Sequence, residues 1–318
     1  MTENNAPYQS LPGQDPVYVY GSSQFDMASE ISGRTYRIFV FKPDTPPPAS
    51  GYPVIVATDG NMTFPIMATT SATFALTGAA ALVVGVGYPT NDPVSLFSLR
   101  YRDQTPPTPH SNIQQRPDLP PVNPDDYGGS ENFYHFLVEE LRPLIAGCYP
   151  VDANNQTLYG HSIAGMFTLS ILFNHPGSFR NFVASSPSIW WNKRSVLNDI
   201  PDFKRKIQAG EAVPRVLVLV GDKEQDLPVT LPPQMTSVLM KKMPHMPSAI
   251  RNIIARIFVK KKMLEYRMVS NARDVGMRLQ EIKGKPGYVA RFNAFADEDH
   301  LTALPASISR ALAFALIP

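Results

Sequence analysis

The chain has 318 residues, of which 43% are hydrophobic and 18% charged, and its formal net charge is +2. Such a composition can fill a large core, which excludes a disordered or coiled-coil protein, and the small net charge argues against nucleic-acid binding. A single cysteine, Cys148, excludes an intrachain disulfide. The start of the chain lacks a secretory signal, and no apolar run approaches the roughly 18 residues of a membrane span. We therefore expect a soluble cytoplasmic protein that does not contact a membrane.

The first half of the chain begins with a polar stretch, residues 1–15, which we expect to be a flexible tail. Apolar runs then predict three strands, at Tyr36–Lys42, Val54–Ala57 and Ala81–Val86. A proline-rich loop is expected from Tyr88 to about Gly128. Apolar residues at helical spacing predict a helix from Ser130, as N-cap, to Ile145, with a kink or a shifted last turn at Pro143.

The second half continues the alternation of strands and helices. Strands are expected at Gln156–Tyr159, Phe182–Ala184, Val216–Val220 and Tyr288–Phe295. The region between Asp222 and Lys285 is predicted to be helical and basic, and a helix from about Leu301 to Leu316 closes the chain. Strands that alternate with helices in this way predict an α/β fold, with a mostly parallel sheet covered by helices on both faces. Function in such sheets lies at the carboxyl ends of the strands.

The sharpest motif is Gly160-His161-Ser162-Ile163-Ala164-Gly165, which stands where a predicted strand passes into a predicted helix. A serine on such a turn, flanked by small residues, is typical of the nucleophile elbow of an α/β-hydrolase. The usual second glycine is Ala164 here, which misses the G-x-S-x-G pattern by one methyl group. The alternative is an ordinary Gly/Ser turn. The flanking elements favour Ser162 as a nucleophile.

A serine nucleophile needs a general base and an acid that orients it, in the chain order serine, acid, histidine. Of the six histidines, only His300 follows the last predicted strand and precedes the last helix. The acid should follow the strand before it, where Asp222, Glu224 and Asp226 all stand. The residues alone leave these three carboxylates unresolved.

The charge that develops on the substrate's carbonyl oxygen must be met by N–H donors. One is expected from the backbone of Ile163, directly after the serine. The other is expected from Gly60 or Asn61, in the Thr58–Asn61 loop that follows an earlier strand; the alternative for that loop is a plain Asp-Gly turn. The predicted chemistry is ester hydrolysis through an acyl-enzyme, and it requires neither a metal nor an organic cofactor.

The chain resembles esterase D-like α/β-hydrolases, and within them the siderophore trilactone esterases of the enterochelin type. The resemblance covers roughly residues 17–317, and it rests on several segments taken together. These are Ser32–Ile38, Thr58–Asn61, Val84–Pro89, Arg100–Pro106, Gly128–Gly129, Gly160–Ser162, Ser185–Trp191 and Val220–Gln225.

The resemblance implies an α/β-hydrolase domain over residues 16–318 and, by the match of the acid loop, favours Glu224 as the acid. It also implies hydrolysis of a catecholate ester after iron uptake. Cationic contacts would help such an anionic substrate to bind, so Arg100 and Arg102 are candidate substrate contacts. Trp190 and Trp191 could stack on its aromatic rings, or they could simply pack over the sheet edge.

One segment departs from the resemblance, because residues 232–262 are longer than usual and rich in Met, Lys and Arg. They could form a lid or cap over the site, or a pair of surface helices with basic outer faces.

Two alternative functions remain open from the sequence. One is a general carboxylesterase or acyltransferase that uses the same residues on other acyl groups. The other is a non-catalytic binding protein on a hydrolase fold, against which the presence of both Ser162 and His300 weighs.

Overall fold

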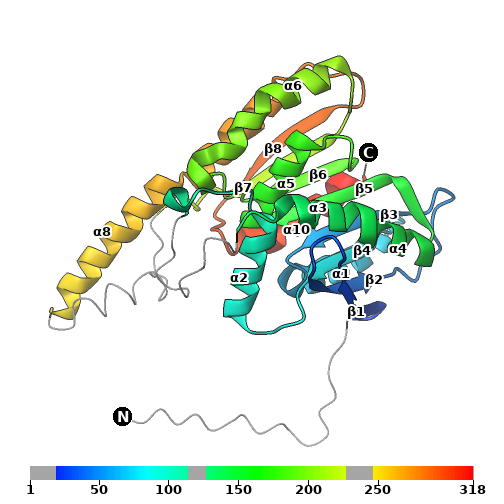
Figure 1. Cartoon of the computed structure of the whole chain (residues 1–318), viewed down its shortest axis with the longest axis horizontal. Helices are drawn as coiled ribbons and strands as arrows, with labels where there is room; N and C mark the ends of the chain where they lie inside the picture. The colour runs from blue at the N-terminus through cyan, green and yellow to red at the C-terminus, as the bar shows by residue number, and fades with distance from the viewer. Residues whose placement is uncertain (1–18, 114–126, 227–245, 318) are drawn as a thin grey trace, which may run out of the picture.

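The computed structural model describes residues 19–113, 127–226 and 246–317, arranged around one eight-stranded sheet (Figure 1). The strand order is β1-β2-β4-β3-β5-β6-β7-β8. The pairs β1–β2 and β2–β4 are antiparallel, and every other pair is parallel. The strands are β1 (Ser22–Ala28), β2 (Thr35–Phe41), β3 (Tyr52–Thr58), β4 (Leu82–Gly87), β5 (Val151–His161), β6 (Asn181–Ser185), β7 (Arg215–Gly221) and β8 (Val289–Phe295).

Helices cover both faces of the sheet, and the predicted α/β fold is confirmed. The α-helices are α1 (Gly60–Ala75), α2 (Pro93–Gln104), α3 (Ser130–His135), α4 (Arg142–Cys148), α5 (Ile163–Asn174), α6 (Ile200–Ala209), α8 (Ser248–Tyr266), α9 (Met268–Gln280) and α10 (Ala303–Leu316). Short 3-10 helices are η1 (His110–Asn112) and η4 (Trp191–Asp199), and a π-helix, η3 (Phe136–Leu141), joins α3 to α4.

The core lies in two layers, one on each side of the sheet, because successive residues of a strand point to opposite faces. In β7, Val216, Val218 and Val220 face the layer that contains α5, α6 and α9. Leu217 and Leu219 of the same strand face the layer of α10 and α1. A strand buried on both sides reads as an unbroken apolar run, which is why the sequence predicted these central strands.

Three local expectations differ from the structure. Helix α2 occupies part of the region expected to be loop, and Asp92 caps it by accepting a hydrogen bond from Ser95 N at 2.8 Å. Gly129, rather than Ser130, is the N-cap of α3. Pro143, expected to kink the predicted helix or to shift its last turn, lies instead in the first turn of a separate helix, α4, after the chain has widened into the π-helix. The ring is tolerated there because the first N–H groups of a helix need no partner within it.

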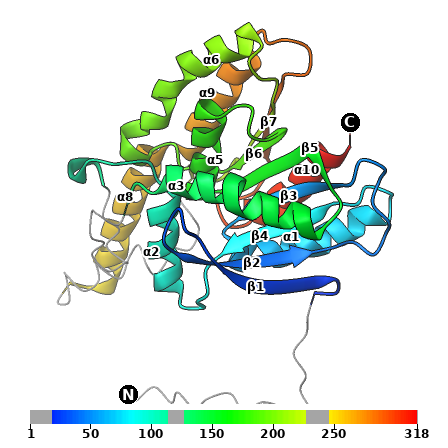
Figure 2. The ribbon, with the colours of Figure 1, turned by 45° about the vertical axis from the view of Figure 1, so that its right-hand side comes forward.

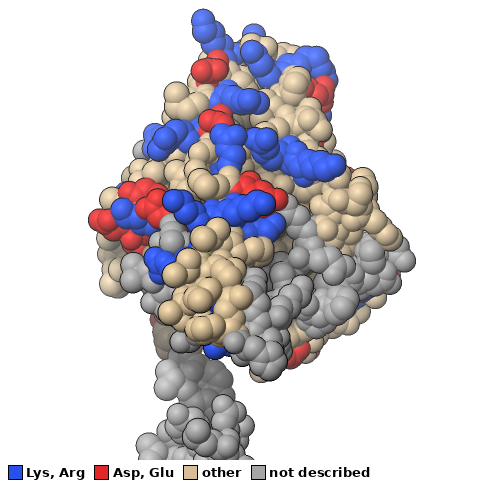
Figure 3. Space-filling model, turned by 90° about the vertical axis from the view of Figure 1, so that its left-hand side faces the viewer, with Lys and Arg blue, Asp and Glu red and all other residues tan. Residues whose placement is uncertain are grey.

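Helix α8 projects from the side of the molecule, away from the sheet (Figures 1 and 2). This helix is formed by most of the described part of the Met- and Lys-rich segment 232–262. Residues 232–245 of that segment lie outside the described residues, as does the expected tail at 1–15. Lys and Arg side chains gather on this side of the molecule (Figure 3). Among the described residues, no helix is long and apolar enough to cross a membrane.

Candidate active site

The turn between β5 and α5 holds Ser162 in a backbone conformation that L-residues rarely adopt, with φ 64° and ψ −119°. Two backbone bonds maintain it: Ser162 N donates to Ser185 O, and Ser188 N donates to Ser162 O, both at 2.9 Å. Strain of this kind persists only where the surroundings enforce it, and it presents the side chain at the carboxyl end of the strand.

Close packing explains the small residues around the serine. A Cβ on Gly160 would lie 2.2 Å from Ala164 O, and one on Gly165 would lie 2.6 Å from Ser185 O. Ala164 itself is fully buried, so the structure accommodates its methyl group at this position. The departure from the second glycine of the motif is therefore tolerated, because the glycine that this close approach requires is Gly165.

The structure brings His300 to the serine across 138 residues of sequence. The distance from His300 Nε2 to Ser162 Oγ is 3.0 Å, and the distance from His300 Nδ1 to Glu224 Oε2 is 2.7 Å. The side chain of His300 is 38% exposed, so a substrate can reach it, whereas the side chain of Glu224 is 0% exposed. The two side chains thus join a solvent-facing ring to a carboxylate inside the protein.

Of the three carboxylates left open by the sequence, only Glu224 contacts the histidine. Its other oxygen, Oε1, accepts hydrogen bonds from Gly221 N at 2.7 Å and from Ser186 Oγ. Asp222 accepts a hydrogen bond from Asp297 N at 2.9 Å, which anchors the loop that carries His300. Asp226 is exposed.

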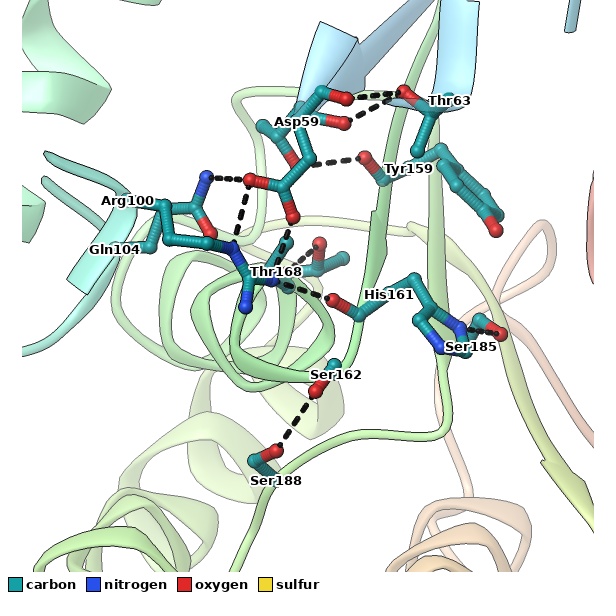
Figure 4. Close-up of polar contacts among 12 residues, drawn as sticks. Asp59, Thr63, Arg100, Gln104, Tyr159, His161, Ser162, Thr168, Ser185 and Ser188 are labelled. Atoms are coloured by element: carbon teal, nitrogen blue, oxygen red, sulfur yellow. Dashed lines mark hydrogen bonds and ion pairs between the residues drawn. The ribbon is translucent and has the colours of Figure 1, made fainter. Parts of the chain in front are cut away.

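The buried carboxylate of Glu224 decides which atoms donate in the hydrogen bonds that link Ser162, His300 and Glu224. A buried carboxylate only accepts, so Nδ1 of His300 must donate to Glu224, which leaves Nε2 as an acceptor for the Ser162 hydroxyl. Ser162 Oγ also lies 3.3 Å from Ser188 Oγ (Figure 4), and because the Ser162 proton is already committed, Ser188 is the donor there. The arrangement can remove the proton of Ser162 and activate it as a nucleophile.

His161, which the sequence placed beside the serine without a role, packs beneath His300, with ring centroids 4.9 Å apart. Its ring nitrogens lie 3.0 Å from Ser185 Oγ and 3.0 Å from His300 O. Burial above all, and then repulsion from Arg100 and from His300 whenever that ring is protonated, holds the pKa of His161 well below its usual 6.5. His161 is therefore a neutral support for the backbone of the His300 loop.

The expected oxyanion donors lie at the starts of two helices on adjacent parallel strands. Ile163 N is the first N–H of α5, and Gly60 N and Asn61 N are the first two of α1. Neither N-cap residue, Ser162 of α5 or Asp59 of α1, makes a capping hydrogen bond with its side chain. Uncapped N–H groups at a helix N-terminus form a site that favours negative charge. The Asn61 side chain is engaged elsewhere, because it donates to Tyr88 O and accepts from Tyr88 N.

Two of the four candidate substrate contacts are not available to a substrate, and these expectations require correction. Arg100 is only 9% exposed, and its guanidinium pairs with Asp59. Trp191 is 2% exposed, and its Nε1 donates to Thr108 Oγ1 at 3.0 Å. Trp190 and Arg102 are partly exposed. The ring of Trp190 stacks on Tyr266 of α8, with centroids 4.4 Å apart.

The eight-stranded and mostly parallel sheet, the helices on both of its faces and the serine turn between β5 and α5 are together those of an α/β-hydrolase. The family model described as "Putative esterase" matches residues 29–247, and the chain belongs to this esterase family. The class of protein is therefore an ester hydrolase, and the resemblance noted in the sequence is confirmed.

Individual relatives of the chain are siderophore esterases. The ferri-bacillibactin esterase BesA of Bacillus subtilis (strain 168) is 35% identical over 92% of this chain and 88% of its own length. The siderophore triacetylfusarinine C esterase of Aspergillus fumigatus is 29% identical over 93% of this chain and 94% of its own. The crystal structure of the BES protein from Bacillus cereus has a TM-score of 0.75 and 28% identity, covering 96% of this chain and 99% of that one.

Proposed function

We propose that this chain is a serine esterase that hydrolyses the ester bonds of a siderophore, most closely a catecholate trilactone, through an acyl-enzyme. The observation that carries the catalytic part is the unbroken chain from Ser162 Oγ through His300 to Glu224, with distances of 3.0 and 2.7 Å. The substrate class is supported by the names of the relatives, which are siderophore esterases.

In the first step, Nε2 of His300 takes the proton of Ser162 as its Oγ attacks the ester carbonyl. The negative charge on the carbonyl oxygen is held by Ile163 N and by the N–H groups at the start of α1. Glu224 keeps the imidazole in the correct tautomer and stabilises the imidazolium that forms.

In the second step, the bond between the acyl carbon and the alcohol oxygen breaks, and the protonated His300 gives its proton to that oxygen. In a cyclic trilactone the new hydroxyl stays tethered to the acyl group on Ser162, whereas in a linear ester the alcohol departs. A water molecule then gives a proton to His300 and attacks the acyl carbon. Ser162 leaves with its proton restored, and the acid is released. Each cycle opens one ester bond, so a trilactone requires three.

Two variants test the catalytic proposal. Ser162→Ala and His300→Ala should each lower kcat on the order of 10³-fold or more while leaving the fold intact. A fluorophosphonate should label the wild-type chain and not Ser162→Ala. A labelled Ser162→Ala protein, or a His300→Ala protein with a near-normal rate, would contradict the assignment, and the absence of labelling in the wild type would favour a non-catalytic binding protein.

A direct comparison of two substrates tests the substrate class. The purified chain is given a ferric catecholate trilactone and, separately, short p-nitrophenyl esters, and kcat/KM is compared. A higher kcat/KM for the trilactone supports a siderophore esterase. A value below that for the short esters would instead favour a general carboxylesterase or acyltransferase, because both would use the same catalytic residues.

A further inference from the structure

We propose that Arg100 is a positioning residue that holds the carboxylate of Asp59 away from the start of α1 and so keeps the oxyanion hole open. The inference rests on the proposed function, since it concerns the donors that would meet the substrate's oxyanion. It assigns to Arg100 a role within the protein in place of the substrate contact expected from the sequence.

Asp59 occupies the N-cap position of α1, where an aspartate normally turns back and accepts a hydrogen bond from the second or third N–H of its own helix. Here its side chain makes no capping hydrogen bond. Its backbone lies in the left-handed region, with φ 56° and ψ 42°, which is uncommon for a residue other than glycine. The side chain is buried and points toward α2.

Three hydrogen bonds from α2 hold the carboxylate in that position (Figure 4). Arg100 donates to it from Nε at 3.1 Å and from Nη2 at 2.6 Å, and Gln104 donates from Nε2 at 2.8 Å. A planar guanidinium that grips a carboxylate with two parallel bonds fixes direction as well as distance. The first two N–H groups of α1 are therefore left without a cap from Asp59, although its side chain lies next to them, while Met62 N and Thr63 N donate to Asp59 O.

The same guanidinium reaches the nucleophile turn. Arg100 Nη2 lies 3.3 Å from His161 O, one residue before Ser162. One side chain thus connects the end of β3, where α1 begins, to the end of β5, where α5 begins. These are the two backbone segments whose N–H groups must converge on a single oxygen atom.

Charge explains why the arrangement matters for the reaction. If the guanidinium is removed, the Asp59 carboxylate is free to rotate back and accept from the first N–H groups of α1. The donors are then occupied, and a negative charge stands beside the oxygen on which negative charge develops. Removing the carboxylate as well should relieve both effects, and this makes the proposal testable with a pair of variants.

The test measures kcat and KM on a neutral p-nitrophenyl ester and on an anionic ester, together with the Kd of a boronic acid, a probe that forms a tetrahedral adduct with the serine. The variants are Arg100→Met, Asp59→Gly and the double variant; glycine is chosen because it adopts a positive φ readily. Arg37→Met is the matched control, since it breaks a two-bond pair with Asp26 on the outer strands, away from the site.

For Arg100→Met we expect kcat to fall about 10²-fold to 10³-fold on both esters, as when an oxyanion donor is lost. KM should stay within about threefold, and the affinity for the boronic acid should fall in parallel with kcat. The double variant should recover about tenfold or more relative to Arg100→Met, and Arg37→Met should match the wild type. Thermal unfolding, measured on each sample, ensures that kcat is compared only between folded proteins.

Two results would overturn the proposal. A KM that rises for the anionic ester alone, with kcat unchanged, would make Arg100 a substrate contact. A folded double variant no faster than Arg100→Met would show that Asp59 does not obstruct the donors. If Arg100→Met does not fold, Arg100→Lys keeps the positive charge but removes the two parallel bonds to Asp59, and an unchanged kcat in that variant counts against the proposal. Absence of fluorophosphonate labelling in the wild type would instead remove the proposed function itself.

Discussion

Replacing Glu224 by glutamine tests the catalytic residues by exchanging a single carboxylate oxygen for an NH₂ group. In the structure, Oε1 accepts from Gly221 N and from Ser186 Oγ, and Oε2 accepts from His300 Nδ1. All three partners are donors, so a glutamine can satisfy them only with its single carbonyl oxygen. The oxygen should turn toward the side with two donors, which points the amide NH₂ at His300.

The imidazole must then change its tautomer. Nδ1 of His300 becomes the acceptor of the amide N–H, and the proton moves to Nε2, which faces Ser162 Oγ. A protonated Nε2 cannot remove the serine proton, so we expect kcat to fall about 10³-fold to 10⁴-fold, as for a wrong tautomer in a comparable triad. This loss should remain smaller than that of Ser162→Ala, because a minority of molecules can still adopt the active tautomer.

The assay is steady-state hydrolysis of a p-nitrophenyl ester, with thermal unfolding measured on the same sample. Ser186→Ala is the matched comparison: it removes one donor to Glu224 but keeps the charge and the tautomer, and should cost about tenfold, as for the loss of one hydrogen bond to a charged group. Asp226→Asn, at an exposed position in the same loop, should stay near the wild-type rate. A Glu224→Gln protein faster than Asp226→Asn would refute the assignment of the acid.

Two further predictions concern the backbone and the support of the site. Gly160→Ala should lower the free energy of unfolding by about 3 kcal/mol, because its Cβ would meet Ala164 O at 2.2 Å, whereas Gly147→Ala, which meets nothing within 4 Å, should leave it equal or raise it by about 0.5 kcal/mol; urea denaturation compares the two. His161 has a lowered pKa in the folded state, so the unfolded chain binds its proton first, and stability should be lost as the pH falls below about 6.5, with a slope of at most about 1.4 kcal/mol per pH unit. His161→Gln should flatten this slope between pH 6.5 and 4.5, and an unchanged slope would contradict the prediction.

The sequence predicted the central sheet because its strands are buried on both faces and read as apolar runs. It did not define β1, since this edge strand is largely exposed and its SSQFDMA sequence carries only a weak pattern. It also missed α2, in which Arg100, Asp103 and Gln104 are among the buried residues. A helix that buries polar side chains has no apolar stripe, and only their partners in the folded chain explain its position.

Dependence on partners in the folded chain also separates the parts of the site that the sequence could predict from those that it could not. Ser162 and His300 are recognisable because their place relative to strands and helices is part of the fold, so chain order alone selects them. The hydroxyls of Ser186 and Ser188 lie in a segment that the resemblance marked, yet nothing in their type indicates which of them meets the acid and which meets the nucleophile.

Arg100 shows most clearly where inference from residue type ends. An arginine in a loop beside an anionic substrate's site is a reasonable cation for that substrate, and composition offers no reason to think otherwise. Its real partner stands 41 positions earlier, at a strand end that the sequence assigned to the oxyanion loop for its backbone alone. Whether an arginine serves the substrate or the protein depends on whether a carboxylate already neutralises it, and that is a property of the folded pair.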